Sequence, residues 1–147
     1  MIKPDEIGTI YLEELKIGMS RSLTKQIGEA EINLFAQISE DRNPLHLDKS
    51  AGAASIFKTR IAHGMLSASL FSALIGERLP GHGTIYLSQN LRFCAPVHID
   101  DTVTATVTVT DIIMEKRRVS LACIASVGET VVITGDALVL APSHQQR

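Results

Sequence analysis

Residues 64–76 read GMLSASLFSALIG, and this stretch decides the fold because it contains no charged residue. Placed on a helix, its apolar side chains occupy most of the circumference, with small residues among them. A helix that is apolar nearly all round is a buried one. Glu77 and Arg78, followed by Pro80 and Gly81, end the segment where water resumes. We therefore predict a buried central helix over residues 64–76.

The chain after Gly83 has the patterns of β-strands. Residues 102–110 read TVTATVTVT, which places valine or alanine on one face and threonine on the other. That alternation is typical of an antiparallel strand with one face in the core and one in water. Further strands are expected at residues 84–93, 119–127 and 130–140, joined by short polar turns. The sequence thus predicts an α+β fold in which a curved antiparallel sheet wraps the central helix.

Shorter helices are expected before the central one. Residues 29–39 place Ile32, Phe35 and Ile38 on one helical face, with two glutamates in the first turn, where the helix dipole favours negative charge. A small helix is expected from Asp48, its N-cap, to about Phe57. Both helices flank the segment that carries the candidate site.

Residues 39–48, SEDRNPLHLD, carry a candidate acid/base pair. Pro44 fixes its own φ, lacks an N–H and pushes Asn43 toward extended geometry. We therefore expect a sharp turn between Asp41 and His46, rather than a helix that runs through both. Such a turn can aim both side chains into one cavity, with Asn43 as a hydrogen-bonding brace. There the pair could hold a water molecule, take its proton and return a proton to carbon.

Composition and charge argue against several classes of protein. The 147 residues carry a net charge of −2 and no tryptophan, which disfavours a nucleic-acid partner. No uncharged run approaches the roughly 20 apolar residues that cross a bilayer, and the first residues lack the apolar core of a signal peptide. The length fits a single domain over residues 1–147. We expect a cytoplasmic protein with no membrane partner.

The two cysteines indicate neither a disulfide framework nor a metal site. Cys94 and Cys123 lie far apart in apolar, strand-like segments, without Cys-x-x-Cys spacing. Both are expected to be buried free thiols. No other cluster indicates a metal site.

Three stretches together resemble a known family: SEDRNPLHLD at 39–48, AHGMLSASLFSALIG at 62–76 and IYLSQNLRFCAPVHIDD at 85–101. They are similar to the MaoC-like (R)-specific enoyl-CoA hydratases. The chain closely resembles the short, single-domain bacterial type that supplies (R)-3-hydroxyacyl-CoA for polyhydroxyalkanoate synthesis. The resemblance covers most of the chain, and its specific part is the motif Asp-x-Asn-Pro-x-His. The resemblance implies the hot-dog fold, in which about five antiparallel strands wrap a long helix.

The resemblance also implies a reaction, the reversible addition of water to trans-2-enoyl-CoA to give (R)-3-hydroxyacyl-CoA. Asp41 and His46 match the catalytic pair, and Gly64 matches the residue whose backbone N–H binds the thioester carbonyl. Asn43 matches a bracing asparagine, and Ser72 matches a serine that supports the pair. Family members are homodimers, and this redox-neutral hydration needs no cofactor besides the CoA of the substrate.

Two neighbours of Gly64 and one departure from the family complete the candidate site. His63 and Met65 flank Gly64 and are candidates for contact with the substrate. Glu40 stands where many family members carry glycine. That change alters the flexibility of the turn and leaves the acid/base pair unchanged.

Two alternative functions share this fold. A hot-dog acyl-CoA thioesterase would hydrolyse the same kind of substrate, and we would expect an acidic residue within its central helix as base or nucleophile. Residues 64–76 contain none, and Glu77 lies only at the helix end. A non-catalytic acyl-CoA binding module would have no need for Asp41, Asn43 and His46 together. Hydration is therefore the favoured hypothesis.

Overall fold

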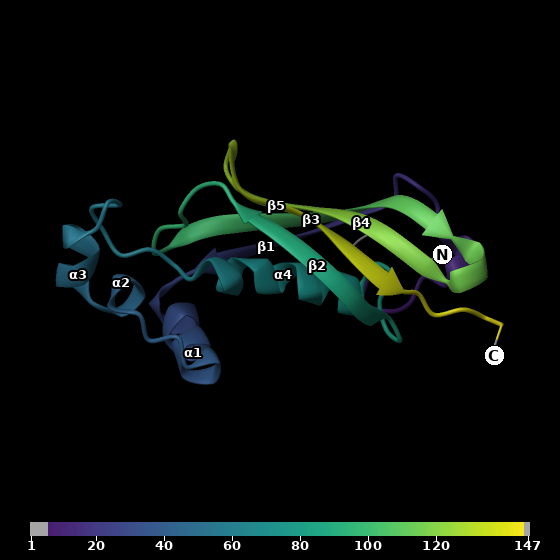
Figure 1. Ribbon diagram of the computed structural model, residues 1–147, viewed down its shortest axis with the longest axis horizontal. Coiled ribbons are helices and arrows are strands. Elements are labelled where there is room, and N and C mark those ends of the chain that lie inside the picture. Colours follow the sequence, from purple (N-terminus) through teal and green to yellow (C-terminus); the bar gives the residue numbers. More distant parts are fainter. Residues whose placement is uncertain (1–5, 146–147) are drawn as a thin grey trace.

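The computed structural model describes residues 6–145 and shows one sheet that curves around a long helix (Figure 1). The strands are β1 (Ser20–Ile27), β2 (Ile85–Phe93), β3 (Asp101–Ile113), β4 (Arg118–Val127) and β5 (Thr130–Leu140). Their order across the sheet is β1-β3-β4-β5-β2, and every neighbouring pair is antiparallel. The predicted α+β architecture, with five strands around a central helix, is confirmed.

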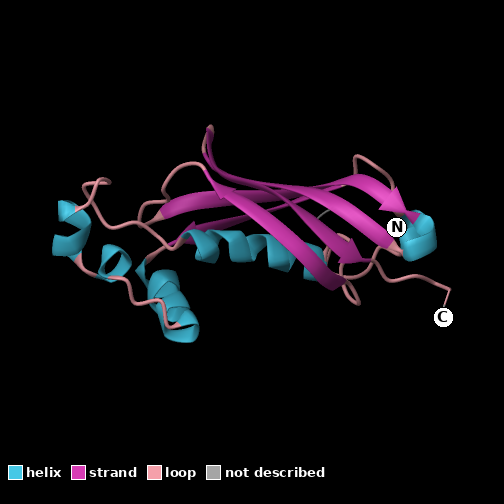
Figure 2. Cartoon of the chain, in the orientation of Figure 1, coloured by secondary structure: helices cyan, strands magenta, loops and turns pink. Residues whose placement is uncertain are grey.

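The helices divide into one long helix and a group of three short ones. They are α1 (Glu29–Ser39), α2 (Pro44–Leu47), α3 (Lys49–Ala54) and α4 (Gly64–Glu77), with single 3₁₀ turns at Leu12–Glu14 and Met114–Lys116. The long helix α4 lies along the inner face of the sheet, and the three short helices gather beyond one end of it (Figure 2). That end is where α4 begins. Within residues 6–145, no helix has both the length and the apolar character required to cross a membrane.

The inner face of the sheet and α4 form the core. Phe71, Leu74 and Ile75 of α4 are at most 1% exposed, and they face a strand, β3, whose Val103 and Val107 are fully buried. Burying a side chain of this size stabilises the fold by about 1.5–3 kcal/mol. The predicted alternation along β3 is confirmed, because its valines and alanine are buried. Its threonines on the outer face bond to side-chain hydroxyls of β1.

The sheet covers only part of α4. Met65, Ser69, Ser72 and Gly76 are exposed and follow one another at helical spacing, so they form an open stripe along the helix. The sequence predicted a helix buried nearly all round, and for this stripe the prediction is wrong. A single sheet encloses one side of a helix, and among residues 6–145 of one chain nothing packs against the other side of α4 here.

The first helix also differs in detail from its prediction. Helix α1 has the expected bounds, and Ile32 is fully buried. Ile38, however, is 84% exposed, and Ala36 takes the second buried position. Because α1 lies beyond the end of the sheet, it has a narrow contact with the core. The more distant end of its apolar face therefore remains in water.

The turn after α1 ends in a short helix. Asn43, with φ of −54° and ψ of 125°, lies outside the helical region as predicted, and Pro44 then occupies the first position of α2, where its missing N–H costs nothing. His46 therefore lies on a one-turn helix, and no helix runs through both Asp41 and His46, as predicted. Asp48 caps the next helix, α3, as predicted. That helix ends at Ala54, before the expected Phe57.

The two cysteines differ in environment. Cys123 is fully buried in β4, as expected, and burial raises the pKa of its thiol. Cys94 is exposed just after β2, so the expectation of a second buried thiol is wrong. Strand β2 lies at the edge of the sheet, and most of its residues are exposed. An apolar sequence at an edge strand therefore does not guarantee burial.

Candidate active site

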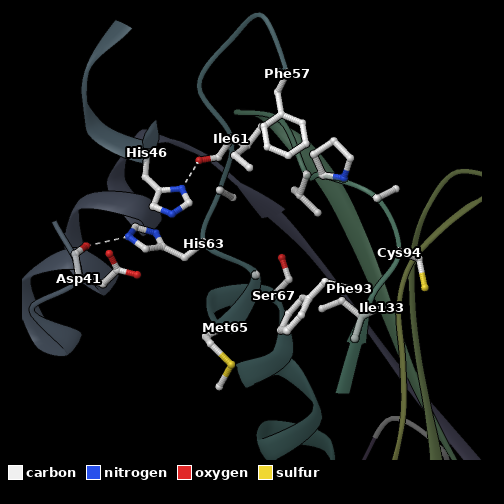
Figure 3. A pocket seen from close by; sticks show the side chains of 15 residues that line it. Asp41, His46, Phe57, Ile61, His63, Met65, Ser67, Phe93, Cys94 and Ile133 are labelled. Carbon is white, nitrogen blue, oxygen red and sulfur yellow. Dashed lines mark hydrogen bonds between the residues drawn. The ribbon is translucent and has the colours of Figure 1, made fainter. Parts of the chain in front are cut away.

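A cavity of about 400 Å³ opens at the N-terminal end of α4 (Figure 3). Its wall on one side comes from the Asp41 loop and α2, and on the other from the end of β2 and the loop that follows. The first turn of α4 lies between them. Five predicted site residues line this cavity: Asp41, His46, His63, Gly64 and Met65. The turn predicted from the sequence thus does bring the acid/base pair to the start of the central helix.

His46 is buried on α2 and is held through both its ring and its backbone. Its Nδ1 bonds to the carbonyl of Ile61 at 2.7 Å. Since a carbonyl only accepts, Nδ1 carries the proton, and in the neutral imidazole Nε2 is the nitrogen with the lone pair. Arg60 donates to the His46 carbonyl at 2.9 Å and also pairs with Glu29 of α1 at 2.9 Å. The ring therefore presents one defined nitrogen to the cavity.

The segment that carries the Ile61 carbonyl is itself held by a connecting loop. Ile61 forms an antiparallel bridge with His98, and Ala62 N–H donates to the Val97 carbonyl at 2.7 Å. Residues 61–62 are thus hydrogen bonded to the loop between β2 and β3. The orientation of His46 depends in this way on a segment far along the chain.

Asp41 lies in the loop between α1 and α2. Its carboxylate accepts a hydrogen bond from Asn43 N–H at 3.1 Å, and its own N–H donates to Ser39 Oγ at 3.1 Å. Glu40, just before it, ends α1 in the left-handed conformation, with φ of 65°. Glycine adopts that conformation without strain, which fits the glycine that the family resemblance implies at this position.

The side chain of His63 lies between the Asp41 loop and His46 of α2, and the residue is 2% exposed. Its Nε2 bonds to the Asp41 carbonyl at 2.9 Å, and its ring stacks on His46 with centroids 4.0 Å apart and planes at 28°. Phe35 of α1 contacts the same ring, with centroids 4.9 Å apart. The structure thus brings His63 against both members of the predicted pair.

The start of α4 offers unpaired amides to the cavity. His63 is the N-cap, and its side chain makes no capping bond. The first two N–H groups of a helix have no partner inside the helix, so those of Gly64 and Met65 remain available. The helix dipole adds about half a positive charge at this point. Such a site suits an oxygen that carries or develops negative charge.

Packing also explains why residue 64 is a glycine. A Cβ at this position would lie 2.6 Å from two ring carbons of Phe93, at the end of β2. Phe93 therefore rests directly on the backbone of the first helical turn. Sequence reasoning missed this contact, because nothing in the local pattern links residue 93 to residue 64.

Ser67 is a second residue that sequence reasoning missed. It lines the cavity, is 0% exposed, and its hydroxyl has no hydrogen-bond partner within the described residues. A buried polar group without a partner costs about 1–3 kcal/mol. Its position one turn after Gly64 is the only signal that could have suggested it.

Two predicted residues lie elsewhere. Ser72 is exposed on the open stripe, two helical turns after Gly64, and does not line the cavity. The side chain of Asn43 accepts from Leu45 N–H at 3.1 Å and so caps α2, while its backbone N–H supports Asp41. The supporting roles assigned to these two residues stay predictions.

The same side chains could be considered as metal ligands. Asp41, His46 and His63 offer donor atoms that all lie within 4.8 Å of one another. Zinc ligands, however, converge on the ion at about 2.0–2.2 Å. Two imidazoles that stack with centroids 4.0 Å apart and planes at 28° keep their in-plane lone pairs in separate, nearly parallel planes, which disfavours convergence on one ion. This arrangement suits proton transfer better than metal binding.

A curved antiparallel sheet around one long helix, with the candidate acid/base pair at the start of that helix, is the arrangement expected of a hot-dog hydratase. Comparison with known proteins identifies the family. A model described as "MaoC like domain" matches residues 7–133. The chain belongs to the MaoC-like family.

The chain is similar to characterised relatives over most of its length. It is 50% identical over 140 residues to an (R)-specific enoyl-CoA hydratase of Rhodospirillum rubrum, covering 95% of this chain and 97% of the relative. It is 46% identical over 141 residues to a 3-hydroxybutyryl-CoA dehydratase of Methylorubrum extorquens, with coverage of 96% and 90%. A solved (R)-hydratase from A. caviae, described as involved in PHA biosynthesis, matches with a TM-score of 0.85 at 45% identity, covering 88% of this chain and 99% of that one.

Proposed function

We propose that this chain is an (R)-specific enoyl-CoA hydratase, which adds water reversibly to trans-2-enoyl-CoA to give (R)-3-hydroxyacyl-CoA. The observation that carries the proposal is the meeting of three features in one cavity. They are the Asp41 carboxylate, the Nε2 of His46, whose Nδ1 is held by the Ile61 carbonyl, and the uncapped start of α4. The names of relatives that are 46–50% identical over nearly the whole chain support it.

The mechanism follows from where charge develops. Attack of water on the β-carbon pushes electrons through the conjugated system onto the thioester oxygen. The Gly64 N–H, helped by the helix dipole, would stabilise that oxygen more strongly in the transition state than in the ground state. Losing one such donor typically costs about 3–4 kcal/mol in the barrier.

The proton transfers would fall to Asp41 and His46. A water molecule held between the carboxylate and Nε2 loses a proton to the pair as its oxygen bonds to the β-carbon. The same pair then delivers a proton to the α-carbon. The electrons return from the oxygen, the carbonyl is restored, and the sum is the addition of H and OH across the double bond.

The cofactor, partner and location expectations belong to the same proposal. Hydration is redox-neutral, so we expect full activity after exhaustive dialysis against EDTA. A homodimer is supported by the open stripe of α4 and by edge strand β2, which exposes Ile85, Leu87 and Phe93. A single domain and a cytoplasmic location remain predictions from the sequence.

One assay tests the proposal against its two alternatives. Absorbance of the conjugated enoyl thioester and release of free thiol are followed together, with crotonyl-CoA as the probe. Hydration removes the absorbance without thiol release, and a thioesterase would release thiol. A binding module would change neither signal. Thiol release, or an inert mixture, would overturn the proposed function.

A further inference from the structure

The imidazole of His63 differs from an ordinary core residue in how its two nitrogens are used. Nε2 bonds to the Asp41 carbonyl at 2.9 Å, and Nδ1 is buried without a partner within the described residues. A buried polar atom without a partner is unfavourable, so an apolar ring would fill the same space at lower cost. What an apolar ring cannot supply is the bond to the Asp41 backbone.

The contacts of His63 join three parts of the site. Its own backbone begins α4 and is followed directly by Gly64. Its Nε2 holds the backbone of Asp41, and its ring lies flat against His46 (Figure 3). The start of the helix, the carboxylate loop and the catalytic imidazole are therefore positioned by one side chain.

We propose that His63 is a positioning residue for hydration: it sets the distance between the acid/base pair and the amides at the start of α4. This inference rests on the proposed function. The need for such a residue follows from the local structure. Asp41 lies in an exposed loop, and its described bonds to Ser39 and Asn43 are all local, so they do not fix the loop relative to α4. His63 makes that connection through the Asp41 carbonyl.

The atoms also exclude direct proton transfer by His63. Because a carbonyl can only accept, Nε2 carries the proton and donates it in the bond to Asp41. Nδ1 has no contact with solvent in the cavity. Neither nitrogen is placed to exchange a proton with the substrate, so the residue acts through Asp41 and His46.

Two substitutions separate the two contacts. His63→Phe keeps an aromatic ring against His46 and removes the donor to Asp41. His63→Gln lacks the ring but places an amide N–H close to the position of Nε2. We expect His63→Phe to lower kcat for crotonyl-CoA about 10²-fold with little change in KM, because a misplaced group slows the chemical step. His63→Gln should recover about tenfold of that loss or more.

The outcomes that would overturn the proposal are equally specific. Equal losses in both variants, or a kcat within about threefold of the wild type in His63→Phe, would remove the positioning role. The pH profile of His63→Gln should keep the wild-type shape, and loss of one limb would instead make His63 a proton donor or acceptor. Thermal unfolding of each variant identifies a folding defect. If His63→Phe does not fold, the kcat and the pH profile of His63→Gln decide the positioning role.

A spectroscopic measurement tests the contacts without any activity. Nitrogen-15 NMR of labelled histidines in the wild type should show opposite tautomers, with Nδ1–H for His46 and Nε2–H for His63. An inactive wild-type protein with these tautomers would overturn the hydratase proposal alone. An active wild-type protein in which His63 carries its proton on Nδ1 would overturn the positioning role alone.

Discussion

At the residue scale, the stacked histidines His46 and His63 differ in which ring nitrogen is hydrogen bonded to a backbone carbonyl. The Ile61 carbonyl takes Nδ1 of His46 and so leaves Nε2 for chemistry, whereas the Asp41 carbonyl takes Nε2 of His63. Two residues of one type therefore have different uses in one cavity. The sequence alone could not separate them, because each carbonyl comes from a residue 15 or 22 positions away.

The acid/base pair itself gives the first prediction. Asp41→Asn and His46→Ala should each lower kcat/KM for crotonyl-CoA by about 10²–10⁴-fold, because each removes one partner of the proton transfer. Asp111→Asn, at an exposed position of β3, is the matched control and should keep wild-type activity. Circular dichroism checks the fold of every variant. Near-wild-type turnover in either site variant would remove that residue from the mechanism.

Gly64 gives the second prediction. A methyl group in Gly64→Ala would lie 2.6 Å from the Phe93 ring, so the ring or the helix start must move, and we expect kcat/KM to fall about tenfold or more. In a Phe93→Ala background the same change should have little effect. A double-mutant cycle measures this coupling. Additive losses would show that the contact with Phe93 does not explain the glycine.

At the scale of elements, the start of α1 carries a pH-dependent contribution to stability. Gly28 N–H donates to the Glu31 carboxylate at 2.8 Å, and this bond lowers the pKa of Glu31 below its ordinary 4.5. The folded state therefore binds fewer protons than the unfolded state. The stabilisation is present above the ordinary pKa and is lost as the pH falls through the lowered folded-state pKa.

The third prediction follows from the lowered pKa of Glu31. Glu31→Gln should lower the free energy of unfolding at neutral pH, and the difference from the wild type should shrink as the pH falls below 4.5. Urea unfolding at several pH values measures it. Glu129→Gln, in the exposed turn between β4 and β5, is the control and should show no such trend. A difference that is independent of pH would contradict the assignment.

Helices and strands with strong periodicity were predictable from the sequence, but the elements that pack against them were not. The alternation of residues 102–110 correctly predicts β3, and the uncharged run correctly predicts α4, because side-chain period and burial are local properties. Ser67 and Ser72 show the limit. Both are small polar residues of α4, but only the course of the sheet decides that Ser67 is buried at the cavity and Ser72 is open. Cys94 is exposed for the same reason, since the sequence does not reveal which strand lies at the edge.

At the scale of the whole molecule, the open stripe of α4 leads to the fourth prediction. A Cβ on Gly76 would meet nothing within 4 Å in the single chain, so Gly76→Arg should be harmless to a monomer. If a second chain covers the stripe, the arginine should split a particle of twice 15.9 kDa into single chains. Analytical ultracentrifugation measures the mass. Asn33→Arg, on the exposed side of α1, is the control.

Two results would contradict the dimer through this face. A wild-type protein that sediments as a single chain would exclude it outright. A Gly76→Arg variant that keeps the dimeric mass would place the contact elsewhere.

The bridge between Ile61 and His98 links the loop between β2 and β3 to the orientation of His46. Ordinary surface loops accept an extra residue at small thermodynamic cost. Here one more residue between Ala95 and Val97 would shift the strip that carries the Ile61 carbonyl, and the imidazole bonded to it would tilt. The length of this loop should therefore be constrained as strictly as the identities of Asp41 and His46.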